Sequence, residues 1–141
     1  MRIDIKKNDC KFYVNEEERT IVCVIHCDKY LVEYYVNELT HNYFWLPFNE
    51  REKIKMPSTF IGKAVCTEND TWDEELGRDI AFERAKDKFY KSFFKRANRL
   101  IEMIDGHVID MIDSFNNIGT KVEKRMGELR KNIEERVGEG E

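Results

Sequence analysis

The most regular pattern of apolar positions in this chain lies in its C-terminal third. From Ala97 to Val137 an apolar residue recurs every three or four positions. Steps of four and three alternate as far as Val122, a spacing that lays a narrow apolar stripe along a helix and favours a partner helix. The steps after Val122 are 4, 3, 4 and 4, which drift toward an eleven-residue period. The predicted contact residues, called the seam below, are Ile101, Ile104, Val108, Met111, Phe115, Ile118, Val122, Met126, Leu129 and Ile133.

The first half of the chain has the β-branched and aromatic alternation that is typical of strands. Residues 11–14 and 20–27 predict a hairpin around a polar loop at 15–19. Strands are also predicted at 2–6, 54–56 and 59–66. After Asp28 the pattern suits either a strand or a short helix, whose inner face would hold Leu31, Tyr34, Tyr35 and Leu39. Residues 41–47 predict a loop.

A change from strands to helix is predicted at Thr71. The sequence Thr71-Trp72-Asp73-Glu74 fits a capping box, in which the Thr hydroxyl and the Glu carboxylate satisfy backbone N–H groups at a helix start. The acidic stretch 68–75 lacks the Asp-x-Asp-x-Asp-Gly order of a calcium loop, so capping is the better interpretation.

No proline follows Thr71, and the seam keeps its spacing through Gly106 and Gly119. We therefore expect one long helix or two nearly collinear helices, which either fold back near Asp105-Gly106 or pair with another copy. The predicted fold class is α+β, with a small antiparallel β-sheet packed on a long amphipathic helix. The predicted division is an α+β domain over 1–105 and a helical, coiled-coil-like tail over 106–141.

Charge is unevenly distributed along the chain. Residues 84–99 hold seven basic groups and one acid, which gives +6, so a net charge of −4 leaves −10 for the remainder. At 100° per residue, five of these cations fall within about 80° of one another on a helix. Phosphate backbone, an acidic protein surface or plain solvent would each suit this ridge. The candidate binding cations, called the basic ridge below, are Arg84, Lys88, Lys91, Lys95, Arg96 and Arg99.

Aromatic residues gather around Pro47. They suit either core packing or an interface, and Tyr43 and Trp45 are the candidate contact residues. The four cysteines, at positions 10, 23, 27 and 66, are expected to be reduced thiols, because no CxxC pair occurs and His26 would point away from Cys23 and Cys27 on a strand. No metal or cofactor is predicted.

The sequence offers no sign of catalysis. None of the three serines lies in a nucleophile-elbow setting, and Gly62-Lys63 lacks the preceding glycine of a phosphate-binding loop. No apolar run approaches the roughly 20 residues of a membrane span, and the N-terminus has no secretory pattern. A cytoplasmic, non-enzymatic protein that does not contact membranes is predicted.

Two stretches resemble small uncharacterised proteins of phages and prophages of Gram-positive bacteria. They are Met56-Pro57-Ser58-Thr59-Phe60-Ile61-Gly62-Lys63-Ala64-Val65-Cys66 with Trp72-Asp73-Glu74-Glu75-Leu76-Gly77-Arg78, and Ala81-Phe82-Glu83-Arg84-Ala85-Lys86-Asp87-Lys88 with Lys91-Ser92-Phe93-Phe94-Lys95-Arg96-Ala97-Asn98. The resemblance covers the middle third of the chain and transfers no catalytic residue. It implies a phage accessory protein in the bacterial host cytoplasm, serving replication, recombination or counter-defence, including CRISPR–Cas inhibition.

Three functions follow as expectations. The first is a non-catalytic, anti-CRISPR-like inhibitor that binds a host defence protein or nucleoprotein complex. The second is a DNA- or RNA-binding accessory factor in phage DNA replication or recombination. The third is a structural oligomer alone, and the seam favours a homo-oligomer unless it closes within one chain.

Overall fold

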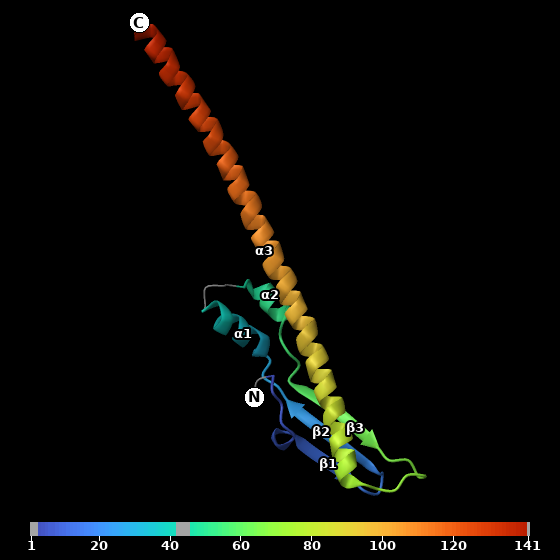
Figure 1. Ribbon diagram of the computed structural model, residues 1–141. Helices are drawn as coiled ribbons and strands as arrows, with labels where there is room; N and C mark the ends of the chain where they lie inside the picture. The colour runs from blue at the N-terminus through green and yellow to red at the C-terminus, as the bar shows by residue number, and fades with distance from the viewer. Residues whose placement is uncertain (1–2, 42–45, 141) are drawn as a thin grey trace. The chain divides into compact units, whose positions relative to one another are not determined.

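The computed structural model describes residues 3–41 and 46–140, with side chains as far as 138. Over these residues it has three strands and four helical elements (Figure 1). In chain order they are the 3-10 helix η1 (Lys7–Asp9), β1 (Lys11–Asn15), β2 (Thr20–His26), α1 (Leu31–Thr40), α2 (Phe48–Lys53), β3 (Thr59–Val65) and α3 (Glu74–Gly140). The predicted α+β class is confirmed.

The sheet is antiparallel throughout, in the order β1-β2-β3. The predicted hairpin is present, with Phe12 opposite Cys23 in the β1–β2 ladder. Cys23 is also opposite Gly62 in β3, so one row crosses all three strands. Arg19, at the end of the hairpin loop, has a positive φ of 53° that completes the reversal of the chain.

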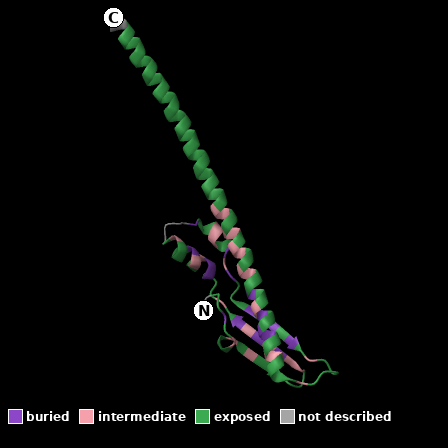
Figure 2. Ribbon diagram, viewed as in Figure 1, coloured by how far each residue is buried: buried purple, intermediate pink, exposed green. Residues whose placement is uncertain are grey.

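Alternate residues of β2 and β3 are buried, and α3 covers that face of the sheet. Figure 2 shows the buried positions gathered where α3 passes over the strands. Phe60 of β3 meets Phe89 of α3 edge to face, with ring centroids 5.4 Å apart. The buried residues of this layer are Ile21, Cys23, Ile25, Phe60, Ala64, Ala81, Phe82, Ala85 and Phe89.

Small residues let α3 approach the strands closely. A Cβ atom at Gly77 would lie 2.5 Å from Cδ1 of Ile21, so a side chain at this position of α3 would have to displace the end of the Ile21 side chain. Gly77, Ala81 and Ala85 follow one another at four-residue intervals and therefore share one helix face. These small residues were not singled out as contact positions from the sequence.

Helix α1 forms, and Leu31 lies on its inner face as predicted, but Tyr34 and Leu39 do not. Leu31, Val32 and Val36 are buried, whereas Tyr34 is 41 % and Leu39 is 79 % exposed. Tyr35 is half-buried and contacts Phe93 of α3 edge to face, with centroids 5.9 Å apart. The β-branched valines therefore take the inner positions that the larger aromatic and leucine side chains were expected to hold.

Two predicted strands are wrong. Residues 3–6 and 54–56 are not in the sheet. Ile54 and Met56 are nevertheless buried, and the Met56 N–H donates to the carbonyl oxygen of Lys29 (2.9 Å). The short helix α2, which the sequence analysis did not predict, ends at Lys53 just before them. Apolar residues at alternate positions thus mark burial here without a strand.

Helix α3 begins two residues later than a Thr71 cap would place it. The carboxylate Oδ1 of Asp73 accepts a hydrogen bond from the N–H of Leu76 (3.1 Å), so Asp73 fills the capping role predicted for Thr71. Gly106, Gly119 and Gly127 do not interrupt the helix, and the alternative of a reversal at Asp105-Gly106 is wrong. By its internal contacts the chain divides into Met1–Leu100 and Ile101–Glu141. We call these the N-terminal unit and the tail.

Candidate interaction surfaces

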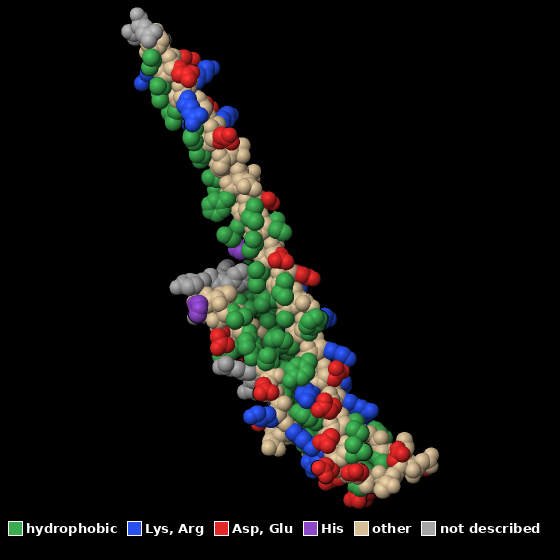
Figure 3. All heavy atoms as spheres, in the orientation of Figure 1, with side chains coloured by type: hydrophobic (Ala, Val, Ile, Leu, Met, Phe, Trp, Pro, Cys, Tyr) green, Lys and Arg blue, Asp and Glu red, His purple; other side chains and the backbone are tan. Residues whose placement is uncertain are grey.

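The seam lies on the exposed surface of the tail. Nine of its ten side chains are between 45 and 66 % exposed, and Ile104 is half-buried. Figure 3 shows hydrophobic side chains gathered along one side of this helix. Ile109 and Ile112, which the seam prediction omitted, are 57 and 54 % exposed and widen the apolar surface at its N-terminal end. A helix with this composition has apolar area available for a partner helix.

Two cations of the basic ridge donate hydrogen bonds to backbone carbonyl groups at the edge of the sheet. β3 is an edge strand of the described sheet, so the carbonyl oxygens along its outer side accept no hydrogen bond from a neighbouring strand there. Nζ of Lys88 donates to the carbonyl oxygen of Ile61 (2.8 Å), and Nη1 of Arg84 donates to that of Lys63 (2.7 Å). These side chains therefore occupy backbone acceptors that another strand would need in order to pair with β3.

Most of the other ridge cations also have partners within the N-terminal unit. Lys91 forms an ion pair with Asp87 (Nζ to Oδ2, 2.8 Å), and Arg99 lies 4.0 Å from Oε2 of Glu50. Arg96 is half-buried and donates to the carbonyl oxygen of Lys55 and to Oγ of Ser92. In the part of the chain that the structure describes, Lys95 is exposed and has no hydrogen bond or ion pair. Whether the ridge binds a partner stays a prediction.

Tyr43 and Trp45, the candidate aromatic contacts, lie outside the described residues. Among their neighbours, Leu46 is buried and Phe48 is 76 % exposed. Leu46 thus belongs to the core, while Phe48, the first residue of α2, has its ring on the surface.

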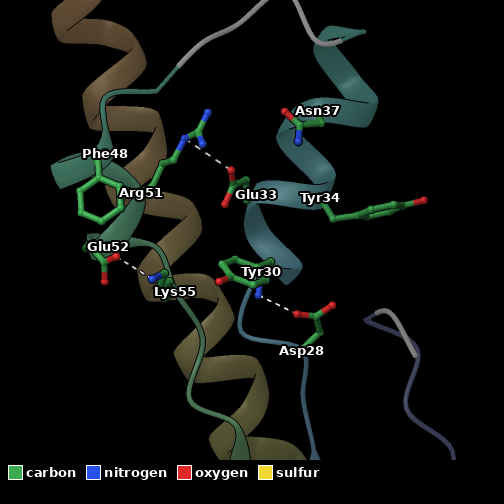
Figure 4. Close-up of a pocket in the computed structure, with 9 residues that line it drawn as sticks. All are labelled: Asp28, Tyr30, Glu33, Tyr34, Asn37, Phe48, Arg51, Glu52 and Lys55. Carbon is green, nitrogen blue, oxygen red and sulfur yellow. Dashed lines mark hydrogen bonds and ion pairs between the residues drawn. The ribbon is translucent and has the colours of Figure 1, made fainter.

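Phe48 lines a cavity of about 480 Å³ between α1 and α2 (Figure 4). Four of its charged residues form two ion pairs: Nε of Arg51 lies 3.4 Å from Oε1 of Glu33, and Nζ of Lys55 lies 2.6 Å from Oε1 of Glu52. Lys55 also lies 5.6 Å from the centre of the Tyr30 ring. This site was not predicted from the sequence, because its residues come from α1, α2 and the segments beside them, and α2 was not expected. Asp28 also lines the cavity, and its Oδ1 accepts a hydrogen bond from the Tyr30 backbone N–H (2.9 Å).

A second apolar surface lies on the face of the sheet opposite α3. Tyr13, Ile61 and Val65 are 58, 49 and 57 % exposed there, and Val22 and Val24 of the central strand are half-buried. The sequence analysis did not single out this face. The alternating exposure of β3 was a usable signal, since Ile61 and Val65 fall on the outer positions of a strand whose inner residues are Phe60, Gly62 and Ala64.

The four cysteines are free. Burial raises the pKa of the Cys23 thiol to about 12, with the neighbouring Cys10 thiol adding to the effect. Burial also raises the pKa of Cys27 to about 11, and it raises the pKa of Cys10. Raised values keep these thiols protonated at neutral pH, the opposite of what a nucleophilic cysteine requires. Among the described residues, no group of three or more His, Cys, Asp or Glu side chains is placed to hold a metal ion.

None of the described helices combines the length and apolar content that crossing a membrane requires. No protein-family model, curated protein or solved structure matches this chain.

Proposed function

We propose that this protein is a non-catalytic assembly protein, in which the tail joins copies of the chain and the N-terminal unit is the part that they display. The observation that carries the proposal is the exposed seam. Nine half-exposed apolar side chains along one helix are unfavourable in water, and a partner helix removes that cost by burying them.

The size of the effect supports association. Completing the burial of nine side chains contributes on the order of 10 kcal/mol per chain before the entropy of association is deducted. A dissociation constant of 1 μM corresponds to about 8 kcal/mol. A dimer buries two seams, about 20 kcal/mol in all, and deducting an association cost of about 4 to 15 kcal/mol leaves about 5 to 16 kcal/mol, a range that includes micromolar self-association.

The ion pairs in the cavity between α1 and α2, together with the protonated thiols, favour binding over catalysis. Four charged residues of the cavity between α1 and α2 are held in two ion pairs, and burial suppresses the thiolate of Cys23 and Cys27. Inhibition of a host defence nucleoprotein and binding of DNA or RNA stay predictions. The ridge contacts lend them little support, because Arg84 and Lys88 already donate to backbone carbonyls.

Light scattering of the full chain tests the assembly function. We expect a molar mass that is a multiple of 16.9 kDa. Phe115→Glu adds a charge to the seam and should return the protein to a single chain. Asn116→Glu adds the same charge at the next residue, off the seam, and should leave the mass unchanged. A wild-type mass of 16.9 kDa at about 100 μM, well above the expected dissociation constant, would contradict the proposal.

A further inference from the structure

We propose that the seam pairs with the tail of a second copy of this chain running antiparallel, with Met111 of each chain opposite Met126 of the other. This inference rests on the proposed self-assembly and adds the orientation and register of the two helices. Two properties of the tail carry it: the mirror symmetry of the seam and the uneven distribution of charge along the helix.

The seam has nearly the same spacing when it is followed in either direction from Ile118. Toward the N-terminus, the steps that begin at Phe115 are 4, 3 and 4. Toward the C-terminus, the steps that begin at Val122 are also 4, 3 and 4, because the heptad period changes there. In an antiparallel pair, residues that face each other have a constant sum of residue numbers. The resulting layers are Phe115–Val122, Met111–Met126, Val108–Leu129 and Ile104–Ile133, with the two Ile118 side chains near the centre.

A twofold axis at the centre makes every layer occur twice, once on each side. The change of period after Val122 is therefore matched by the partner, since the four-residue step from Val122 to Met126 lies opposite the four-residue step from Phe115 to Met111. Ile101 is the one seam residue outside this register, and it lies beside Arg136 and Val137. The spacing alone also permits a parallel pair, so the charges must decide the orientation.

Charge along the tail favours the antiparallel orientation. Residues 101–113 hold four acids (Glu102, Asp105, Asp110 and Asp113) and no Lys or Arg, while 114–120 are uncharged. Residues 124–136 hold five basic residues and three acids, a net +2. A parallel pair in register would place the two acidic segments side by side. The antiparallel pair places each acidic segment beside the basic segment of the other chain, which replaces repulsion by attraction.

In the same register, the N-terminal ends of the two tails lie far apart. Leu100, the last residue of the N-terminal unit, would lie near position 137 of the other tail. At 1.5 Å per residue, the two Leu100 residues are then about 55 Å apart along the paired helices.

Disulfide trapping tests the register, because the tail has no native cysteine. We would co-express the full-length Met111→Cys and Met126→Cys chains, oxidise them mildly, and identify the joined peptides by mass spectrometry. About half of the dimers should hold one chain of each kind, and these should form a disulfide between positions 111 and 126. Either variant alone should crosslink no more than the wild type, because its two new cysteines lie roughly 22 Å apart along the helix axis.

A second pair, Val108→Cys with Leu129→Cys, should behave in the same way if the first pair disturbs the helix. Asp110→Cys with Met126→Cys is the matched control, since position 110 is off the seam, and it should not crosslink above the wild-type level. Crosslinking of Met111→Cys with itself would overturn the antiparallel orientation. A dimer by light scattering without either predicted disulfide would overturn the register and leave the proposed function standing, whereas a single-chain mass would overturn both.

Discussion

Gly62 of β3 lies directly against Ala81 of α3. A Cβ atom at Gly62 would be 2.0 Å from the carbonyl oxygen of Ala81 and 2.4 Å from the backbone nitrogen of Ala85. The obstacle is backbone on both sides, so no side-chain rotation relieves it. The absence of one methyl group thus sets how closely the helix can approach the sheet, and Phe89, Ala85 and Ala81 are fully buried as a result.

Gly62→Ala should destabilise the N-terminal unit by about 3 kcal/mol or more, because α3 must move away from β3 and the core loses its close packing. For a unit of this size, the melting temperature should fall by roughly 12 °C or more. Thermal unfolding followed by near-ultraviolet circular dichroism measures the change. A melting temperature within a few degrees of the wild type would mean that the helix and the strand are not in the contact described.

Glycine-to-alanine changes in the tail should have the opposite effect. A Cβ atom at Gly106 or Gly127 meets nothing within 4 Å, and both residues lie inside α3. Each substitution should stabilise the helix by about 1 kcal/mol through the better helix propensity of alanine. Helical content and the thermal transition of the tail, followed at 222 nm, measure this. A loss of helicity on Gly127→Ala would contradict a continuous helix at that position.

Lys88 contacts the edge of β3 and Lys95 does not, so we expect different effects on stability when each lysine is replaced by alanine. Lys88→Ala removes a hydrogen bond to the Ile61 carbonyl and should cost about 1 kcal/mol of unfolding free energy. It should also increase aggregation, because the β3 edge then offers an unpaired acceptor to other strands. Urea titration and light scattering over time measure the two effects.

Lys95→Ala is the matched control, since it removes the same charge from an exposed side chain. It should change the unfolding free energy by no more than about 0.5 kcal/mol and leave aggregation unaltered. Equal effects of the two substitutions would mean that net charge, rather than the contact with the strand edge, governs the behaviour.

The pKa of Cys23 predicts a loss of stability in alkali. Burial raises the pKa of this thiol to about 12 in the folded protein, against 9.0 for an exposed thiol. The folded state therefore holds its proton more tightly than the unfolded state, so stability is fully present below pH 9 and declines as the pH rises toward 12. The decline is at most about 1.4 kcal/mol per pH unit from this group.

Urea unfolding at pH 8 and at pH 10.5, compared between the wild type and Cys23→Ala, isolates the contribution of this thiol. The variant loses packing at both pH values, but its stability should fall less steeply between them. Cys27, with a pKa of about 11, adds a similar decline that both proteins share. Parallel slopes for the two proteins would show that Cys23 ionises equally well in the folded and unfolded states.

The elements with a clear period were predictable from the sequence. The hairpin of β1 and β2, the strand β3 and the long helix α3 all follow from alternation of two or from recurrence at three and four. Such patterns predict the secondary structure of the segment in which they occur. Ile54 and Met56 show the limit, because alternate apolar residues were buried there without forming a strand.

The sequence by itself determined the α+β class, the apolar stripe of the tail and its charge distribution, since each depends only on the order of residues along one helix or strand. The tertiary structure decided that Asp73 rather than Thr71 caps α3, that valines rather than Tyr34 and Leu39 face inward from α1, and that Arg84 and Lys88 reach the backbone of β3. These outcomes depend on which distant segment lies beside each side chain. The close approach of β3 to α3 at Gly62 is one such contact between distant segments, and the spacing of apolar residues within either segment does not predict it.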